Sequence, residues 1–268
     1  MNDYLTAVLL GIVEGLTEFL PVSSTGHLLV TENLLGLNNT DWEAFTVVIQ
    51  LGAVLAVVAV YWRKFWDVLI GLPSDPKARQ FVINVIVAFL PAAILGALFI
   101  KYINGYLLDP TLAVPVIGVS WLVGGIIILI FERIAPRPRW EGTDNLPVFK
   151  ALEIGLCQCA ALIPGISRSG ATILGGELVG VERATAAHFT FYLAVPTMLG
   201  ATVLQLYQKR HELTSGHLSL IAIGFVVSFI VAYPVVAMFI NFISRYGLKP
   251  FGWYRVVIGT VTVAAVIL

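Results

Sequence analysis

Charged residues are scarce in this chain. Asp, Glu, Lys and Arg make up 12% of its 268 residues, whereas they make up about 25% of an ordinary soluble domain. Hydrophobic residues account for 58%, and the mean hydropathy is +0.90. This composition excludes a soluble globular protein and predicts an integral membrane protein.

Three further absences narrow the possible functions. Sixteen basic residues balance 16 acidic ones, so the chain lacks an overall positive field, and we expect no nucleic-acid partner. Cys157 and Cys159 have no second pair with which to form a zinc site or a disulfide framework, and we interpret them as small buried hydrophobic residues. The first residues, MNDYLTAVLL, contain no basic region and no convincing cleavage site, so we expect them to remain in the mature protein.

Six segments are apolar and long enough to cross a membrane, which takes about 20 residues in a helix. Five are free of charge: Ala44 to Trp62, Gln80 to Ile100, Pro110 to Phe131, Phe189 to Gln208 and Leu218 to Ser244. The sixth, Pro250 to Leu268, contains Arg255 near its start, and we expect that side chain to reach toward the lipid headgroups. Two other apolar segments, Leu5 to Leu37 and Ala151 to Val181, are interrupted by Pro, Gly and hydroxyl residues, and each predicts a re-entrant helix, loop and helix.

The two interrupted segments match each other at an offset of 144 residues. The matched pairs are Ala7 with Ala151, Gly11 with Gly155, Glu14 with Gln158, Ser23 with Ser167, Gly26 with Gly170, and Gly36 with Gly180. The same offset aligns FVINVIVAF from Phe81 with FVVSFIVAY from Phe225. We therefore predict a single all-α polytopic membrane domain over residues 1–268, with repeats at about 1–135 and 149–268 and a cytoplasmic linker at about 136–148. Each half holds one re-entrant pair and three crossings, and an odd number of crossings inverts the second half.

Loop charge predicts the orientation. Most basic residues fall in one set of loops: Arg63, Lys64, Lys77, Arg79, Arg133, Arg137, Arg139, Lys150, Arg245 and Lys249. The opposite loops carry Lys101, Lys209 and Arg210. The positive-inside rule places the first set in the cytoplasm. We thus expect both termini outside, the first re-entrant pair entering from the outer face, and the two tips meeting near the bilayer centre.

The first tip, EGLTEFLPVSSTGH, contains several ionisable groups. Glu14 and Glu18 stand four residues apart on one helix face, where they could chelate a divalent cation, share a proton, or form a structural polar pair. Ser23, Ser24 and Thr25 open a new helix whose free N–H groups favour an anion. His27 lies within a turn of Ser24 and is a candidate for proton transfer or a structural histidine.

The second tip, PGISRSGAT, adds Arg168, whose guanidinium suits a phosphate and keeps its charge. Ser167 and Ser169 are candidates for anion binding, although N-capping alone would also explain them. Gln50 lies inside a span and is a possible cavity-lining residue. Together the two tips predict phosphoryl transfer or hydrolysis at a lipid headgroup.

The two tip motifs closely resemble the signatures of the bacterial undecaprenyl diphosphate phosphatases, also called bacitracin resistance proteins. The resemblance extends over essentially the whole chain. It implies a hydrolase of the bacterial plasma (inner) membrane that converts undecaprenyl diphosphate to the monophosphate carrier for peptidoglycan, supports cell shape, confers bacitracin resistance and requires Mg²⁺ or Ca²⁺. It also implies a polyprenyl diphosphate substrate among membrane lipids, and it leaves a homodimer open.

The resemblance also assigns roles. It makes Glu14 and Glu18 metal or catalytic carboxylates, Ser24 a nucleophile or substrate ligand, His27 the proton-transfer residue, and Ser167 and Arg168 ligands of the diphosphate. Further substrate-binding candidates are Ser23, Thr25, Gly26, Gln50, Ser169 and Thr172.

Three alternatives remain. Ser24, His27 or water could be the nucleophile, and we favour Ser24 with His27 as its base. A transporter or flippase of a polyprenyl phosphate would share the broken helices but would not use a Ser, a His and a carboxylate pair for attack. The membrane phosphatases that use a phosphohistidine require K-x6-RP and SR-x5-H-x3-D, and this chain has neither pattern.

Overall fold

The structure is a computed structural model that describes residues 2–37, 40–107, 109, 112–208 and 218–267. Within these ranges the chain is helical and forms no strand, apart from one isolated bridge between Trp140 and Val181. The α-helices are α1 Asp3–Thr17, α2 Ser24–Leu34, α3 Thr40–Val60, α4 Trp62–Gly71, α5 Pro76–Tyr102, α6 Ala113–Ile134, α7 Val148–Gln158, α8 Arg168–Leu178, α9 Arg183–Gln208, α10 Leu218–Tyr246 and α11 Lys249–Ile267. A π-helical turn follows α5 at Ile103–Leu107, and 3-10 turns lie at Thr143–Asn145 and Cys159–Leu162.

Long apolar helices confirm a multi-pass membrane protein. Five of the described helices, α5, α6, α9, α10 and α11, are long and apolar enough to cross a membrane, and the pair α3–α4 adds a sixth if it counts as one bent span. The sequence predicted that this segment runs straight to Trp62. Instead the helix ends at Val60 and the chain turns by 73° into α4. Tyr61 has a non-helical ψ of 22°. Arg63, Lys64 and Asp67 follow it in α4, and charged residues are costly inside the hydrocarbon.

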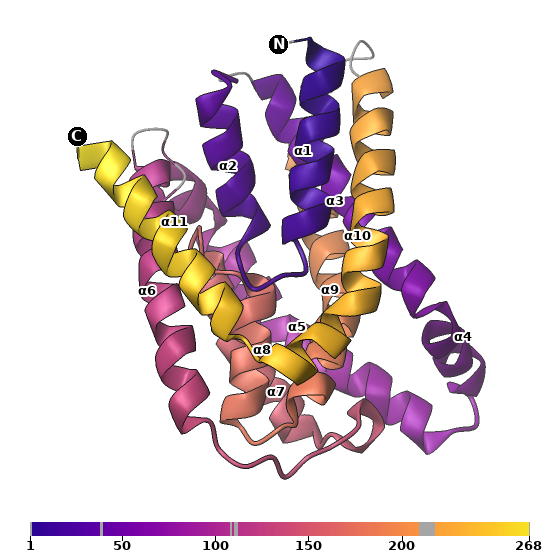
Figure 1. Cartoon of the computed structure of the whole chain (residues 1–268). Helices are drawn as coiled ribbons and strands as arrows, with labels where there is room; N and C mark the ends of the chain where they lie inside the picture. The colour runs from indigo at the N-terminus through magenta and orange to yellow at the C-terminus, as the bar shows by residue number, and fades with distance from the viewer. Residues whose placement is uncertain (1, 38–39, 108, 110–111, 209–217, 268) are drawn as a thin grey trace.

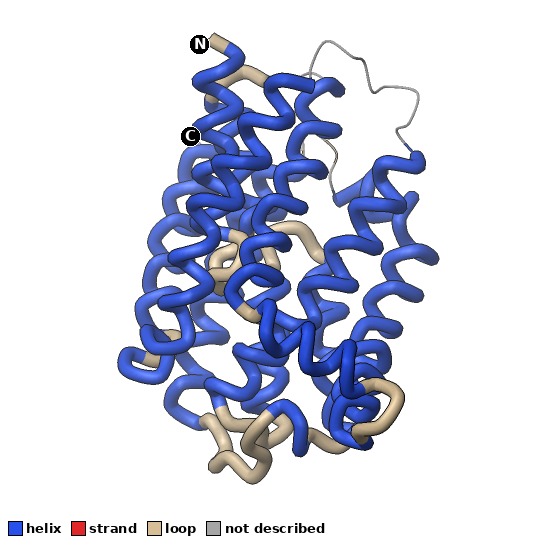
Figure 2. The backbone as a smooth tube through the Cα atoms, turned by 90° about the vertical axis from the view of Figure 1, so that its right-hand side faces the viewer, coloured by secondary structure: helices blue, strands red, loops and turns tan. Residues whose placement is uncertain are grey.

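Two helical hairpins enter the molecule from opposite ends (Figure 1). One consists of α1 and α2, and the other of α7 and α8. Pro21 lies in the first break, while Pro164 and Gly165, whose φ is +86°, lie in the second. Loop segments therefore lie at mid-height between helices (Figure 2), and α8 begins and ends 144 residues after α2.

Each hairpin packs against a helix from the other half of the chain. Helix α1 contacts α10, and α7 contacts α5. Glycine allows both close approaches: a Cβ on Gly11 would lie 2.7 Å from the Gly224 carbonyl oxygen, and one on Gly155 would lie 2.4 Å from that of Ala88. The two halves are thus interleaved, and the hairpin tips are held inside a common helical shell.

The position of Arg255 differs from the prediction. Its side chain does not reach toward headgroups: the residue is only 2% exposed, and its guanidinium donates to backbone carbonyls of Pro21, Ser120 and Gly165. Because the helices are broken, carbonyls without a helical partner lie in the interior. They accept hydrogen bonds from Arg255 there, so its side chain does not need to extend to the lipid headgroups. Cys157 and Cys159 are half-buried and form no disulfide.

Basic residues gather at one end of the molecule. The ten that the sequence assigned to one set of loops lie on α4, at the start of α5, at the end of α6, in the linker, at the start of α7, or at the junction of α10 and α11. These elements lie in the lower half of Figure 1, whereas the chain begins and ends in the upper half. The side chain of Lys101, and Lys209 and Arg210 altogether, lie outside the described residues.

Candidate active site

The first tip places Glu18 and the following serines at a sharp reversal. Glu18 is the residue after α1, and its N–H still donates to the Glu14 carbonyl at 3.0 Å. Ser23 caps α2, with its Oγ accepting from the Gly26 N–H at 3.3 Å. Its φ of +70° is unique among the described non-glycine residues. A β-carbon is strained in this left-handed region, so the tip is held in shape by its surroundings.

The second tip is bonded directly to the first. Ser167 caps α8 by accepting from the Gly170 N–H at 3.1 Å. The hydroxyls of Ser167 and Ser169 lie 2.9 Å apart, and they reach the Leu20 carbonyl oxygen at 3.3 and 2.8 Å, respectively. The N-termini of α2 and α8 therefore meet in one place, with their free N–H groups available to an anion.

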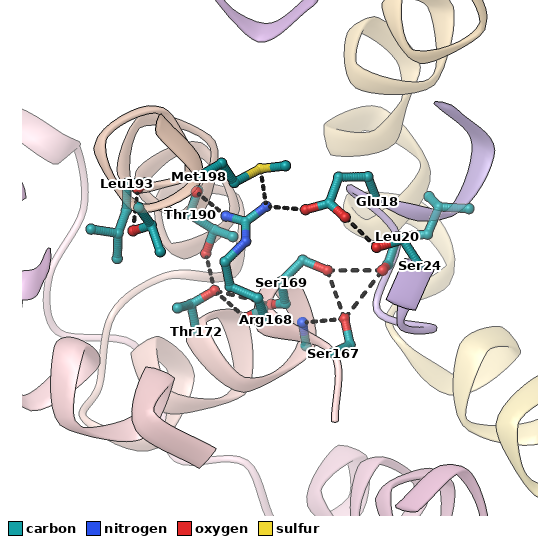
Figure 3. Close-up of polar contacts among 12 residues, drawn as sticks. Glu18, Leu20, Ser24, Ser167, Arg168, Ser169, Thr172, Thr190, Leu193 and Met198 are labelled. Atoms are coloured by element: carbon teal, nitrogen blue, oxygen red, sulfur yellow. Dashed lines mark hydrogen bonds and ion pairs between the residues drawn. The ribbon is translucent and has the colours of Figure 1, made fainter. Parts of the chain in front are cut away.

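Glu18 joins the reactive groups of the two tips (Figure 3). Its Oε2 accepts a hydrogen bond from the Ser24 hydroxyl, and its Oε1 accepts from Arg168 Nη2 at 3.0 Å. The two charged side chains are only 9% and 13% exposed. A serine hydroxyl, a carboxylate that can take its proton, and a cation that can bind phosphate are thus in direct contact.

Helix α9 contacts the guanidinium of Arg168 and orients it. Nη1 donates to the Thr190 carbonyl at 3.4 Å, and Nη2 lies 3.6 Å from the Met198 sulfur. The Thr190 hydroxyl in turn lies 2.8 Å from that of Thr172 on α8. These contacts fix the plane of the guanidinium (Figure 3).

The tips open into a cavity of about 260 Å³. Seven of the predicted site residues line it: Glu18, Ser23, Ser24, Thr25, Gln50, Ser167 and Arg168. The remaining walls come from Ala161, Ile166, Thr197, Met198, Ala201 and Gln205. The cavity is small, and most of its named polar groups are suited to binding an anion.

Five predicted residues do not line this cavity. Gly26 packs against Trp121, where a Cβ would lie 2.7 Å from the indole ring. Ser169 and Thr172 are fully buried beside the tips, in the hydrogen bonds given above. Glu14 and His27 have surroundings of their own.

His27 points toward α6 and α11. Its Nδ1 lies 2.7 Å from the Ser23 carbonyl oxygen, and its Nε2 lies 2.7 Å from the Tyr254 hydroxyl. The ring also packs against Trp121, with centroids 4.7 Å apart. Ser24 thus contacts Glu18 in this structure, whereas both ring nitrogens of His27 are engaged elsewhere.

Glu14 is completely buried one turn before Glu18. None of the described residues donates a hydrogen bond to either of its carboxylate oxygens. No group of three or more His, Cys, Asp or Glu side chains in the described ranges could hold a metal alone. Two carboxylates on one helix face nevertheless fit a hard cation such as Mg²⁺, which usually takes few protein ligands and completes its shell with substrate phosphate and water.

Sequence reasoning missed the contribution of α9. Thr190, Thr197 and Gln205 lie at or beside the cavity, and their spacings of seven and eight residues put them on one face of a helix. A helical projection of this apolar segment would have shown that face as a polar stripe.

A second, apolar cavity of about 500 Å³ adjoins the first. The two cavities share Ile166 and Ser167 as walls. The other lining residues come mainly from α6 and α8, and they include Val123, Ile127, Phe131, Leu174 and Leu178, with Arg255 at one side. The apolar cavity is open to the surface of the protein, because Val123, Ile127 and Leu178 are exposed. Ile166 and Ser167 of the second tip separate it from the polar cavity.

Comparison with known proteins places the chain among related sequences. A family model described as bacitracin resistance protein BacA matches residues 7–261. An undecaprenyl-diphosphatase of Rhodopseudomonas palustris strain BisB18 is 48% identical, over 100% of this chain and 99% of the relative. One from Bradyrhizobium sp. strain ORS 278 is 50% identical with the same coverage, and one from Novosphingobium aromaticivorans is 49% identical over 97% of both chains.

Proposed function

Because the chain belongs to the bacitracin resistance protein BacA family, we propose that it hydrolyses undecaprenyl diphosphate to undecaprenyl phosphate and inorganic phosphate. The observation that carries this proposal is the contact of Ser24 and Arg168 with Glu18 at the wall of the polar cavity. A diphosphate headgroup would bind where the N-termini of α2 and α8 meet, with Arg168 as its fixed cation.

The apolar cavity supports a lipid substrate. Ile166 and Ser167 separate it from the polar cavity, so a headgroup at the tips can be followed directly by the first isoprene units of its chain. The walls named above are aliphatic or aromatic, and a polyprenyl chain would lose little by leaving the bilayer for them.

Ser24 is our proposed nucleophile. Its hydroxyl oxygen attacks the terminal phosphorus while its proton passes to Glu18, the bond from that phosphorus to the bridging oxygen breaks, and undecaprenyl phosphate leaves. Water then hydrolyses the phosphoserine, which releases inorganic phosphate and restores Ser24. The sequence favoured His27 as the base for the first step, but the acceptor in contact with Ser24 is Glu18. We keep His27 as a proton-transfer residue for the water step, after a rotation of its ring away from Tyr254.

Glu14 and Glu18 would hold the cofactor, Mg²⁺ or Ca²⁺. When bound, such an ion neutralises the charge that develops on the phosphoryl oxygens. The support is chemical: Glu14 presents two buried oxygens to which no described residue donates, and a buried carboxylate needs a cation or a proton beside it.

The placement in the membrane follows from the basic end of the molecule. Positive residues mark the cytoplasmic side, which would put the opening of the first hairpin and both termini on the periplasmic or extracellular side. The two halves would then be inverted repeats. Hydrolysis on that side recycles the carrier lipid for peptidoglycan synthesis and lowers the amount of diphosphate that bacitracin can bind, in keeping with the family's name.

Phosphate release from a C55 diphosphate lipid tests the proposal. Purified protein in detergent is assayed with Mg²⁺ or Ca²⁺ and with excess chelator, together with the variants Ser24→Ala and Arg168→Ala. Release should depend on the cation and fall at least a hundredfold in both variants, while Arg245→Ala, an exposed arginine on α10, should match wild type. If folded wild-type protein binds the lipid but releases no phosphate, the chain is a carrier of polyprenyl phosphates instead.

A further inference from the structure

Arg255 connects three separate parts of the molecule. It lies on α11, and its Nη1 donates to the Pro21 carbonyl at 3.3 Å. Its Nη2 donates to the Gly165 carbonyl at 3.0 Å and to the Ser120 carbonyl of α6 at 2.9 Å. One buried guanidinium therefore bonds the backbone of the first tip, the second tip and a spanning helix.

The two tip carbonyls are equivalent positions of the internal repeat. Adding the offset of 144 to residue 21 gives 165. Ser24 follows Pro21 by three residues, and Arg168 follows Gly165 by three. Arg255 thus bonds each tip three residues before a side chain of the site: Ser24 in the first tip and Arg168 in the second.

The surroundings of Arg255 are built for this contact. Gly124 leaves the necessary space: a Cβ there would lie 2.3 Å from Arg255 Nη2. None of the described carboxylates pairs with Arg255. Two of its acceptors are carbonyls of the loops that follow the first helix of each hairpin, and the third, Ser120, lies within α6. A buried cation is costly in a membrane protein, and a lysine, with three donors on one atom, could not bridge carbonyls that the planar guanidinium reaches from separate nitrogens.

We propose that Arg255 is a positioning residue that sets the separation of the two tips and thereby aligns Ser24 and Glu18 with Arg168. It lines the apolar cavity but not the polar one, so it would contact neither the phosphate nor the attacking oxygen. Its effect reaches the reaction through the tip backbones. This inference rests on the proposed phosphatase function.

Two variants test the proposal. Arg255→Lys keeps the charge but not the bridge, and Gly124→Ala keeps the arginine but displaces its guanidinium. Because a misplacement of about 1 Å can cost about a hundredfold in rate, we expect kcat for phosphate release to fall by about that factor in both, with a smaller change in KM. The matched control is Gly118→Ala, which crowds Thr262 in the same α6–α11 contact without reaching Arg255. It should lower the thermal unfolding midpoint but leave kcat of the folded protein unchanged.

Chemical rescue separates positioning from stability. In Arg255→Ala, the position vacated by the side chain borders a cavity of about 500 Å³ and retains the three carbonyls that accepted from Arg255, so a small guanidinium ion can be tested there as a replacement. Millimolar guanidinium should raise kcat of this variant at least fivefold and should not affect wild type or Gly118→Ala. The proposal is overturned if wild type is active but Gly124→Ala and Arg255→Lys retain its kcat, or if Gly118→Ala loses as much kcat as they do. Inactive wild type would overturn the proposed function itself.

Discussion

Replacing Glu18 by Gln removes the charge at the centre of the site and keeps the length of the side chain. In wild type, one carboxylate oxygen accepts from Arg168 at 3.0 Å and the other accepts from Ser24. An amide has a single oxygen, so one of these donors would face an NH₂ group. The proposed proton acceptor is lost as well, and general-base catalysis contributes about 10²–10⁴-fold. We therefore expect kcat to fall by about 10²–10⁴-fold.

The same substitution should destabilise the protein, because it leaves Arg168 buried without its counter-ion. Breaking a buried ion pair from one side costs about 3–5 kcal/mol. At about 2–4 °C per kcal/mol for a chain of roughly this size, the thermal unfolding midpoint should drop by about 6–20 °C. Loss of activity is therefore measured well below the midpoint of the variant, per mole of folded protein.

A double variant separates the two effects. Glu18→Gln with Arg168→Met removes both charges, so the midpoint should recover toward wild type while activity stays lost. Glu141→Gln, at an exposed position in the linker, should change neither quantity. The reasoning is refuted if Glu18→Gln keeps kcat within tenfold of wild type, or if the double variant is no more stable than the single one.

Three other substitutions test the fold and its strain. Gly52→Ala would put a Cβ 2.3 Å from the Phe225 carbonyl oxygen and force α3 and α10 apart, so it should cost about 1–3 kcal/mol in thermal unfolding. Gly105→Ala, where no atom of the described residues would lie within 4 Å of the added Cβ, should cost little. Burial opposes ionisation of Glu182, but backbone N–H groups at the start of α9 donate to its carboxylate and lower its pKa. The cap by Glu182 therefore stabilises the folded protein fully above the unfolded pKa of about 4.3, and this stabilisation is lost as the pH falls through the lower folded pKa. Glu182→Ala should lower the free energy of unfolding by about 1 kcal/mol at pH 7. In acid, the difference in stability from wild type should vanish. Ser23→Gly should relieve the strain of a φ of +70° and raise the free energy of unfolding by about 1 kcal/mol. If the Ser23 hydroxyl binds phosphate, kcat/KM should fall in the same variant. An unchanged kcat/KM would remove Ser23 from the site.

Much of the fold followed from local composition. Apolar length predicted the spans, because the bilayer sets a minimum for a helix that crosses it. Pro21, Pro164 and Gly165, together with the hydroxyl residues that follow them, predicted the two breaks. A proline alone is not sufficient, because α5, α9 and α10 each contain one within the helix (Pro91, Pro196 and Pro234). The helix α4 was missed, because the bend at Tyr61 falls between two helices in a stretch, VAVYWRKF, that contains neither proline nor glycine.

The residues of the candidate site were predictable from the sequence, but the contacts between them were not. Glu18, Ser24, Ser167 and Arg168 were identified because ionisable and hydroxyl groups are rare in apolar segments, and the structure brings them together. The bond from Ser24 to Glu18, and the engagement of His27 with Tyr254, depend on which way each side chain turns from its helix. Spacing along one helix allows both arrangements, and only packing against a second helix selects one.

The sequence by itself determined that this is a membrane protein with two broken hairpins, because hydrophobic length and helix-breaking residues act locally. The tertiary structure decided how residues far apart in the chain combine: Glu18 with Arg168, Arg255 with both tips, and the polar stripe of α9 with the cavity. The bonds from Glu18 to Arg168 and from Arg255 to Pro21 link the two halves of the chain, and all of these contacts join separate elements. Their formation depends on the interleaved packing of the two halves, which a local pattern does not encode.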